Sequence, residues 1–164
     1  RRGRREGGAA GRTGLSMPLR CEVVTQDRRL FEGPADMVLA PGTEGELGIL
    51  PNHAPLLTTL KLGVLRVRFD GEEEVFTIAG GVMEVLPDLV TVLADVGEHV
   101  ADIDVQRAES ARRRAEEMLM KGPPPDTDEY LAIQAALQRS QLRLEAARRY
   151  RRRAPRREEP RESG

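Results

Sequence analysis

The stretch 65-LRVRFDGEEEVFTI-78 decides the fold class of the first part of the chain. Apolar residues alternate with arginines as far as Phe69, and a second apolar segment resumes at Val75. Between them, Asp70-Gly71 is the kind of dipeptide that closes a tight two-residue hairpin turn. The stretch therefore predicts an antiparallel β-hairpin with one face in the core and one face in water.

The same two-residue period extends outward from this hairpin, from Leu19 to about Val96. A further segment after the Pro87-Asp88 turn, residues 89–94, is apolar on both sides and is expected to be buried between two layers. Short strands separated by frequent turns favour a small β-sandwich or barrel. Earlier candidate strands are bounded by Gly, Pro or Asp: Leu19–Thr25, Leu30–Glu32, Asp36–Ala40 and Leu47–Leu50.

From Asp102 onward the apolar period becomes that of a helix. Asp102 or Asp104 can cap its start, and Gly122 followed by three prolines ends it. A second helix is expected from Asp126 until Pro155. The short connection predicts an antiparallel helical hairpin, whose narrow, alanine-rich apolar stripes make it weakly self-sufficient. We therefore predict an N-terminal β-sandwich domain over 17–100 and a C-terminal α-helical hairpin over 101–153.

The charge of the 164-residue chain is distributed unevenly, although its formal total is -1. Residues 1–16 carry +4, residues 139–164 carry +6, and the segment between them carries -11. We expect residues 1–16 to be a disordered basic extension or a misassigned start, and 154–164 to be a charged disordered tail. No apolar run reaches the roughly 18 residues that a membrane helix needs, so a soluble protein is expected.

The residue types argue against an enzyme with its own active site. Cys21 is the only cysteine, which excludes an intramolecular disulfide and a thiolate metal site within one chain. His53 and His99 are the only histidines, and the serines lie in no nucleophile motif. We therefore predict no catalytic residue and no metal site.

Arginines on the two predicted helices offer two interpretations. Arg107 and Arg114 are seven residues apart and return to nearly the same side of a helix, while Arg139 and Arg143 are four apart. These groups are either solvated helix charges or a converging clamp for a polyphosphate, because guanidinium binds phosphate through paired hydrogen bonds. In the first interpretation their partners are Glu109, Glu116 and Glu145. A separate alternative is a stand-alone nucleic-acid-binding module that uses the arginine-rich ends.

Four segments carry a resemblance to a known family: 44-EGELGILPNHAPLLTT-59, 79-AGGVMEV-85, 90-VTVLAD-95 and 103-IDVQRA-108. Together they make residues 17–150 resemble the epsilon subunit of the bacterial rotary F-type ATP synthase. The resemblance implies a flattened β-sandwich of about ten short strands followed by two helices. It also implies a non-catalytic rotor subunit that helps couple proton translocation to ATP synthesis and inhibits ATP hydrolysis through its C-terminal helices.

The resemblance further implies the partners and the location of the chain. The partners would be the gamma subunit of the central stalk, the ring of c subunits, and the alpha and beta subunits through the C-terminal helices. Nucleic acid is not among them. The chain would lie at the cytoplasmic face of the bacterial cell membrane, peripherally and only through the complex. By this likeness a loop region faces the rotor ring with Glu46, His53 and Thr58.

In several members of this family the helical hairpin binds one ATP. No cofactor would be required, and ATP would act as a regulatory ligand. Arg139 and Arg143 match the second-helix arginines when one residue before Tyr130 is omitted. The full set of positions that the resemblance assigns to ATP is Glu98, Ile103, Asp104, Arg107, Ala108, Arg114, Arg139 and Arg143.

Overall fold

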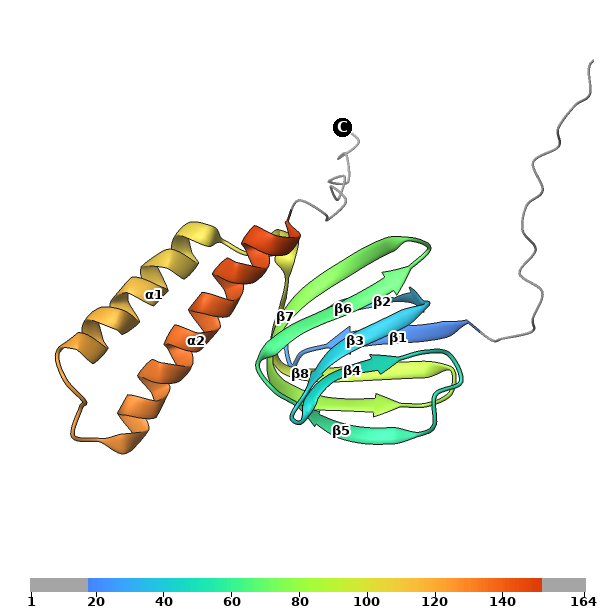
Figure 1. Ribbon diagram of the computed structural model, residues 1–164, viewed down its shortest axis with the longest axis horizontal. Coiled ribbons are helices and arrows are strands. Elements are labelled where there is room, and N and C mark those ends of the chain that lie inside the picture. The colour runs from blue at the N-terminus through green and yellow to red at the C-terminus, as the bar shows by residue number, and fades with distance from the viewer. Residues whose placement is uncertain (1–17, 152–164) are drawn as a thin grey trace, which may run out of the picture.

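The computed structural model describes residues 18–151, with a β-sandwich followed by two packed helices (Figure 1). This arrangement confirms the predicted fold class. The segments 1–16 and 154–164, on which the predictions of disorder and of nucleic-acid binding rest, lie outside the described residues. The elements are β1 (Leu19–Val24), β2 (Arg29–Ala35), β3 (Met37–Gly42), β4 (Gly45–Ile49), β5 (Leu56–Leu60), β6 (Gly63–Phe69), β7 (Glu72–Val85), β8 (Leu89–His99), the 3-10 helix η1 (Val100–Asp102), α1 (Val105–Met120) and α2 (Thr127–Tyr150).

The hairpin predicted from residues 65–78 is β6–β7. Its strands pair in antiparallel register, with Leu65 opposite Phe76. Asp70 and Gly71 both have positive φ, at 51° and 80°, which is the geometry of a turn whose twist matches that of the strands it joins. The prediction of this hairpin and of its turn is confirmed.

The eight strands form one hydrogen-bonded network that folds over on itself. The strand order is β2-β1-β8-β7-β5-β3-β4, and β6 pairs with both β3 and β7. β7 pairs with β6 along its first half and with β5 along its second, so this one strand serves two parts of the sandwich. The resemblance implied about ten short strands; residues 18–151 form eight, because β7 and β8, of 14 and 11 residues, continue without interruption.

A pair of glycines allows β7 to change direction. Gly80 and Gly81 have φ of 76° and 133°, where residues with a side chain are strained. A Cβ placed on Gly81 would lie 2.2 Å from the carbonyl oxygen of Leu93 in β8. Close approach of two backbones, as well as the bend, therefore requires glycine here.

The sandwich core is mostly aliphatic, with Phe76 and Cys21 among its buried side chains and Phe31 packed against it. Alternate residues of β8 face it, with Val90 and Val92 fully buried. Leu93, in contrast, is 54% exposed. The prediction that residues 89–94 are buried on both sides is therefore wrong, because the second face of β8 lies on the outside of the sandwich. Sequence reasoning also missed β5, whose apolar and threonine residues show no clear alternation.

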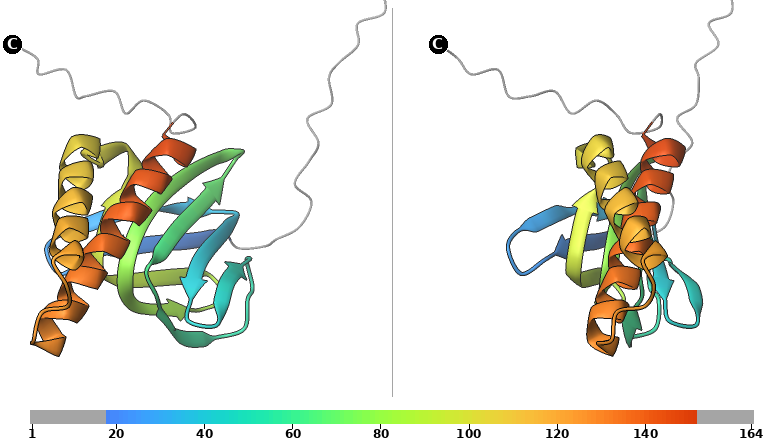
Figure 2. Two further views of the ribbon diagram at one scale, coloured as in Figure 1. Left: turned by 60° about the vertical axis from the view of Figure 1, so that its left-hand side comes forward. Right: turned by 90° about the vertical axis from the view of Figure 1, so that its left-hand side faces the viewer.

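The helical hairpin lies against one side of the sandwich, beside β7 and β8 (Figures 1 and 2). A second, smaller apolar cluster joins the two parts, and α2 contributes Tyr150, Ala146 and Ala147 to it. Val75, Val100 and Ile103 complete its buried set. Because this cluster is small, most of the hairpin surface stays outside the contact.

Both helices begin at an aspartate, as predicted. The carboxylate of Asp104 accepts a hydrogen bond from the backbone N–H of Arg107 at 3.0 Å, and Asp126 accepts from Asp128 at 2.9 Å. Between the helices, Ala108 and Ala115 are buried. The narrow apolar stripe of α1 is therefore used for packing against α2.

Candidate functional site

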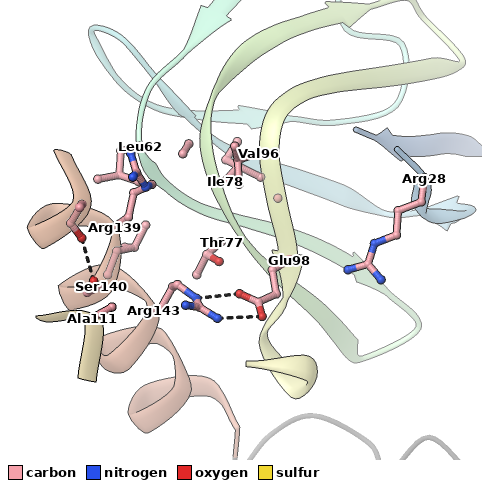
Figure 3. Close-up of a pocket in the computed structure, with 14 residues that line it drawn as sticks. Arg28, Leu62, Thr77, Ile78, Val96, Glu98, Ala111, Arg139, Ser140 and Arg143 are labelled. Carbon is pink, nitrogen blue, oxygen red and sulfur yellow. Dashed lines mark hydrogen bonds and ion pairs between the residues drawn. The ribbon is translucent and has the colours of Figure 1, made fainter. Parts of the chain in front are cut away.

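A cavity of about 470 Å³ lies where the helical hairpin meets the sandwich (Figure 3). This size falls within the range of about 300 to 1,000 Å³ that is usual for small-molecule sites. The walls come from β7 and β8, from both helices, from Leu62, and from the turn between β1 and β2. Its polar and charged lining residues are Arg28, Thr77, Glu98, Arg139, Ser140 and Arg143.

The Glu98–Arg143 ion pair crosses the cavity from the sandwich to α2 (Figure 3). The Arg143 guanidinium donates to both carboxylate oxygens of Glu98, through Nε at 2.8 Å and Nη2 at 3.1 Å. The two side chains are 26% and 23% exposed, so water screens this pair only in part. Such a bidentate pair fixes the relative orientation of the two side chains as well as balancing their charges, and it links α2 to β8.

Arg139 and Ser140 lie one turn earlier on α2. The buried Ser140 hydroxyl donates to the Ala136 carbonyl at 2.7 Å, so its polar group is satisfied by its own helix. Arg139 is exposed, and the ion pairs formed among residues 18–151 do not include it. Its guanidinium is therefore available to a ligand.

The structure brings three of the eight residues that resemblance assigned to ATP to this cavity: Glu98, Arg139 and Arg143. The other five lie elsewhere. Ile103 is buried beneath the hairpin and its carbonyl accepts from Arg151, Asp104 caps α1, and Ala108 is buried between the helices. Arg107 is exposed on α1 and is not among the residues that line the cavity.

The cavity therefore contains only two of the four helix arginines that could form a phosphate clamp, Arg139 and Arg143. Arg114 lines a separate cavity of about 350 Å³ between α1 and α2, together with Met118 and Glu129. Among residues 18–151, these arginines form no ion pair with Glu109, Glu116 or Glu145: Glu116 contacts Arg112 at 3.7 Å, and Arg143 pairs with Glu98. Arg28 is a cavity residue that sequence reasoning missed, since no spacing rule relates the β1–β2 turn to a helix more than a hundred residues later.

The three residues expected to face the rotor ring lie on β4, β5 and the segment between them. In Figure 1 the segment that joins β4 to β5 lies at the end of the sandwich away from the helices. Glu46 forms an ion pair with Arg66 at 3.1 Å, and Thr58 pairs with Met83 across β5 and β7. His53 Nδ1 lies 2.7 Å from the carbonyl oxygen of Ala54, so this nitrogen carries a proton and donates.

An exposed apolar stripe crosses the outer face of three neighbouring strands. Leu57 in β5, Val82 in β7 and Leu93 in β8 are 70%, 37% and 54% exposed. Val82 pairs with Leu93 in β8 and with Thr59 in β5, and Leu57 lies two residues before Thr59. Contiguous apolar groups on a sheet exterior are typical of a protein contact surface. No sequence signal separated these residues from core residues of the same type.

Two reactive side chains, Cys21 and His99, are buried in the sandwich. Burial raises the pKa of the Cys21 thiol from 9.0 to about 12, with a smaller effect from Glu22. His99 Nε2 contacts the Glu74 carboxylate, and its Nδ1 accepts a hydrogen bond from the Ala101 N–H at 3.0 Å.

Within the described part of the chain, no helix is long and apolar enough to cross a membrane, and no group of His, Cys, Asp and Glu could hold a metal ion.

Comparison with protein families matches both parts of the chain. Residues 18–100 match the β-sandwich domain of the ATP synthase delta/epsilon chain, and residues 101–148 match its long α-helix domain. The chain belongs to the ATP synthase delta/epsilon chain family. This membership confirms the resemblance and the prediction of a non-catalytic subunit of the F-type ATP synthase, with a place in ATP synthesis and proton transport.

Bacterial relatives of this delta/epsilon-family chain extend over both domains. The ATP synthase epsilon chain of Psychrobacter cryohalolentis is 44% identical over 137 residues, which cover 83% of this chain and 98% of that protein. The epsilon chain of Pelotomaculum thermopropionicum is 52% identical over 102 residues, covering 62% of this chain and 76% of the relative.

Solved structures with the same fold are more distant in sequence. A chain of the Euglena gracilis mitochondrial ATP synthase, in a structure of its OSCP, F1 and c-ring, has a TM-score of 0.68 at 22% identity. That match covers 88% of this chain and 89% of the other. A chain from the central stalk and c-ring of the Tetrahymena thermophila enzyme has a TM-score of 0.53 at 15% identity. At these identities the likeness shows the fold alone.

Proposed function

We propose that this delta/epsilon-family chain is the epsilon-type subunit of the central stalk in a bacterial proton-translocating ATP synthase. The observation that carries the proposal is the match to bacterial epsilon chains along 98% of one relative's length, through both the sandwich and the helices. In this assignment the chain works as a rotor part at the cytoplasmic face of the cell membrane. It reaches the membrane only through the complex.

The sandwich would provide the attachment to the rotor. The stripe of Leu57, Val82 and Leu93 is exposed and apolar, which suits a stable contact with the gamma subunit. The β4–β5 region, with Glu46, His53 and Thr58, would meet the polar loops of the c-ring. Replacing Leu57 and Leu93 with serine should reduce co-purification with the gamma subunit, whereas the same change at Met120, 86% exposed on α1, should not.

The helical hairpin would inhibit ATP hydrolysis when it leaves the sandwich. Its contact with the sandwich includes a small apolar cluster, the Glu98–Arg143 pair and a hydrogen bond from Arg151 to the Ile103 carbonyl. Because these contacts are few, the hairpin could separate from the sandwich at a modest cost in free energy. Undocked helices would bring basic side chains of α2, including Arg139, Arg148 and Arg149, toward acidic surfaces of the alpha and beta subunits. The docked hairpin would then permit ATP hydrolysis, and the undocked hairpin would inhibit it.

ATP would favour the docked state if it binds in the cavity, because the cavity includes walls from both the sandwich and α2. Its three arginines exceed its one carboxylate, so the site has the charge that a polyphosphate requires. A ligand shifts a conformational equilibrium only through different affinities for the two states, and this site exists only when the hairpin is docked.

Two measurements test these roles separately. Deleting residues 103–164 should raise ATP hydrolysis by the assembled enzyme while the sandwich still joins the complex; unchanged hydrolysis would refute the inhibitory role. Isothermal titration calorimetry of the isolated full chain with ATP tests the ligand. Absence of binding at millimolar ATP would remove the sensing role and leave the stalk assignment standing.

A further inference from the structure

We propose that Arg28, in the turn between β1 and β2, is an additional phosphate-binding residue of the cavity. This inference rests on the nucleotide binding proposed above and extends it to a part of the sandwich far from the helices in sequence. It makes the β1–β2 hairpin a third contributor to the site, beside β8 and α2.

Arg28 lines the same cavity as Glu98, Arg139 and Arg143. In the view of Figure 3, Arg28 approaches from one side of Glu98 and Arg143 from the other. Arg28 is exposed, and the ion pairs within residues 18–151 do not include it. Its neighbour Arg29 differs in this respect, since Arg29 pairs with Glu32 at 2.5 Å.

The backbone that carries Arg28 is held in place by Thr25. The Thr25 N–H donates to the Arg28 carbonyl at 2.9 Å, and the Arg28 N–H donates to the Thr25 hydroxyl oxygen at 3.3 Å. These bonds close the turn from both directions. Arg28 therefore starts from a fixed backbone position, so only its side chain has to become ordered when it binds an anion.

Gly97 allows this turn to approach the cavity. It lies in β8 immediately before Glu98, and a Cβ built on it would lie 2.9 Å from Cδ1 of Leu30 and 3.4 Å from Cγ2 of Thr25. The β1–β2 hairpin thus packs on β8 where a side chain is missing. An alanine here would meet only the flexible end of the Leu30 side chain, which can shift, whereas a bulky side chain would also press on Thr25 and on the turn that carries Arg28.

The charges of the cavity indicate what Arg28 would bind. Arg143 is already neutralised by Glu98, which leaves Arg28 and Arg139 as two guanidinium groups without an ion-pair partner among residues 18–151. Two such groups on separate elements suit a ligand with more than one negative charge along its length, as in the phosphate chain of a nucleoside triphosphate. A ligand held in this way links the β1–β2 turn to α2 and stabilises the docked hairpin.

The test is calorimetric titration of ATP into the full chain and into two neighbouring variants, R28Q and R29Q. Both remove one positive charge from the same turn. R28Q should raise the Kd for ATP about 10-fold or more, as expected for loss of a charge-assisted hydrogen bond, while R29Q should stay within about 2-fold of the parent. Equal Kd values for R28Q and R29Q, with ATP bound by the parent chain, would overturn the inference.

A second variant reaches the same contact without changing charge. G97L, which places a bulky side chain beneath Leu30 and Thr25, should weaken ATP binding although Arg28 is intact, and a thermal melt establishes that it folds. Unaltered affinity in folded G97L would contradict the positioning argument. Failure of the parent chain itself to bind millimolar ATP would instead refute the proposed nucleotide site, so the two failures are distinguishable.

Discussion

Breaking the Glu98–Arg143 pair should release the helical hairpin from the sandwich without unfolding either part. The pair contains two charge-assisted hydrogen bonds of 2.8 and 3.1 Å between side chains that are about three-quarters buried. Exposed pairs contribute about 0.2–1 kcal/mol, and hydrogen bonds to charged groups contribute about 1.5–3 kcal/mol. For this partly screened pair we expect a coupling energy of about 1–2 kcal/mol, which corresponds to a population of undocked hairpin about 5–30-fold higher.

The assay is a double-mutant cycle of Glu98→Ala and Arg143→Ala, read by native-state hydrogen exchange. Amides of α1 and α2 should exchange faster in each single variant, while amides in the core strands β6 and β7 should change little. Arg112 and Glu116 provide the control, because this pair within α1 is 45% and 46% exposed at 3.7 Å and should give about 0.3–0.5 kcal/mol or less. A Glu98–Arg143 coupling no larger than that of the control would refute the reasoning.

Three further changes test the packing of the sandwich and its junction with the helices. Gly81→Ala should lower the free energy of unfolding by about 3 kcal/mol or more in urea titrations, because its Cβ would lie 2.2 Å from the backbone of Leu93. Gly71→Ala, whose Cβ would have nothing within 4 Å, should lower it by about 1 kcal/mol. The native Cys21 thiol should not react with Ellman's reagent at pH 8, because burial raises its pKa to about 12. This folded pKa exceeds the unfolded value of 9.0, so the contribution of Cys21 to stability is complete below pH 9 and is lost as the pH rises toward 12. His99→Ala should lower the free energy of unfolding by about 1–3 kcal/mol, because the Ala101 N–H loses its acceptor, His99 Nδ1, and the Glu74 carboxylate loses its contact with the imidazole. Backbone amides of η1 and α1 should then exchange their hydrogens faster.

Local patterns were sufficient to predict the β6–β7 hairpin and both helices. In each case the signal lies within a few residues: a turn dipeptide at Asp70-Gly71, and aspartate caps at Asp104 and Asp126. Such signals act through backbone conformation and neighbouring hydrogen bonds. They do not depend on how distant parts of the chain meet.

Features that depend on tertiary contacts were not accessible in this way. Leu93 and Val92 are adjacent and both apolar, yet one lies outside the sandwich and the other in its core, because strand pairing decides the face. Arg28 reaches the cavity because β1 pairs with β8, which brings the β1–β2 turn beside Gly97 and Glu98. Arg107 and Arg143 belong to one predicted set, but the packing of α1 on α2 leaves Arg107 outside the cavity.

In the proposed function, the docked hairpin permits ATP hydrolysis and the undocked hairpin inhibits it. Cysteines introduced at positions 98 and 143 can be joined by a short bismaleimide, and the buried native Cys21 should not compete for the reagent. The decisive measurement is ATP hydrolysis by the reconstituted enzyme before and after this cross-link. Cross-linking should raise hydrolysis to the level obtained with residues 103–164 deleted. Continued inhibition by the cross-linked chain, equal to that of the uncross-linked chain, would contradict it.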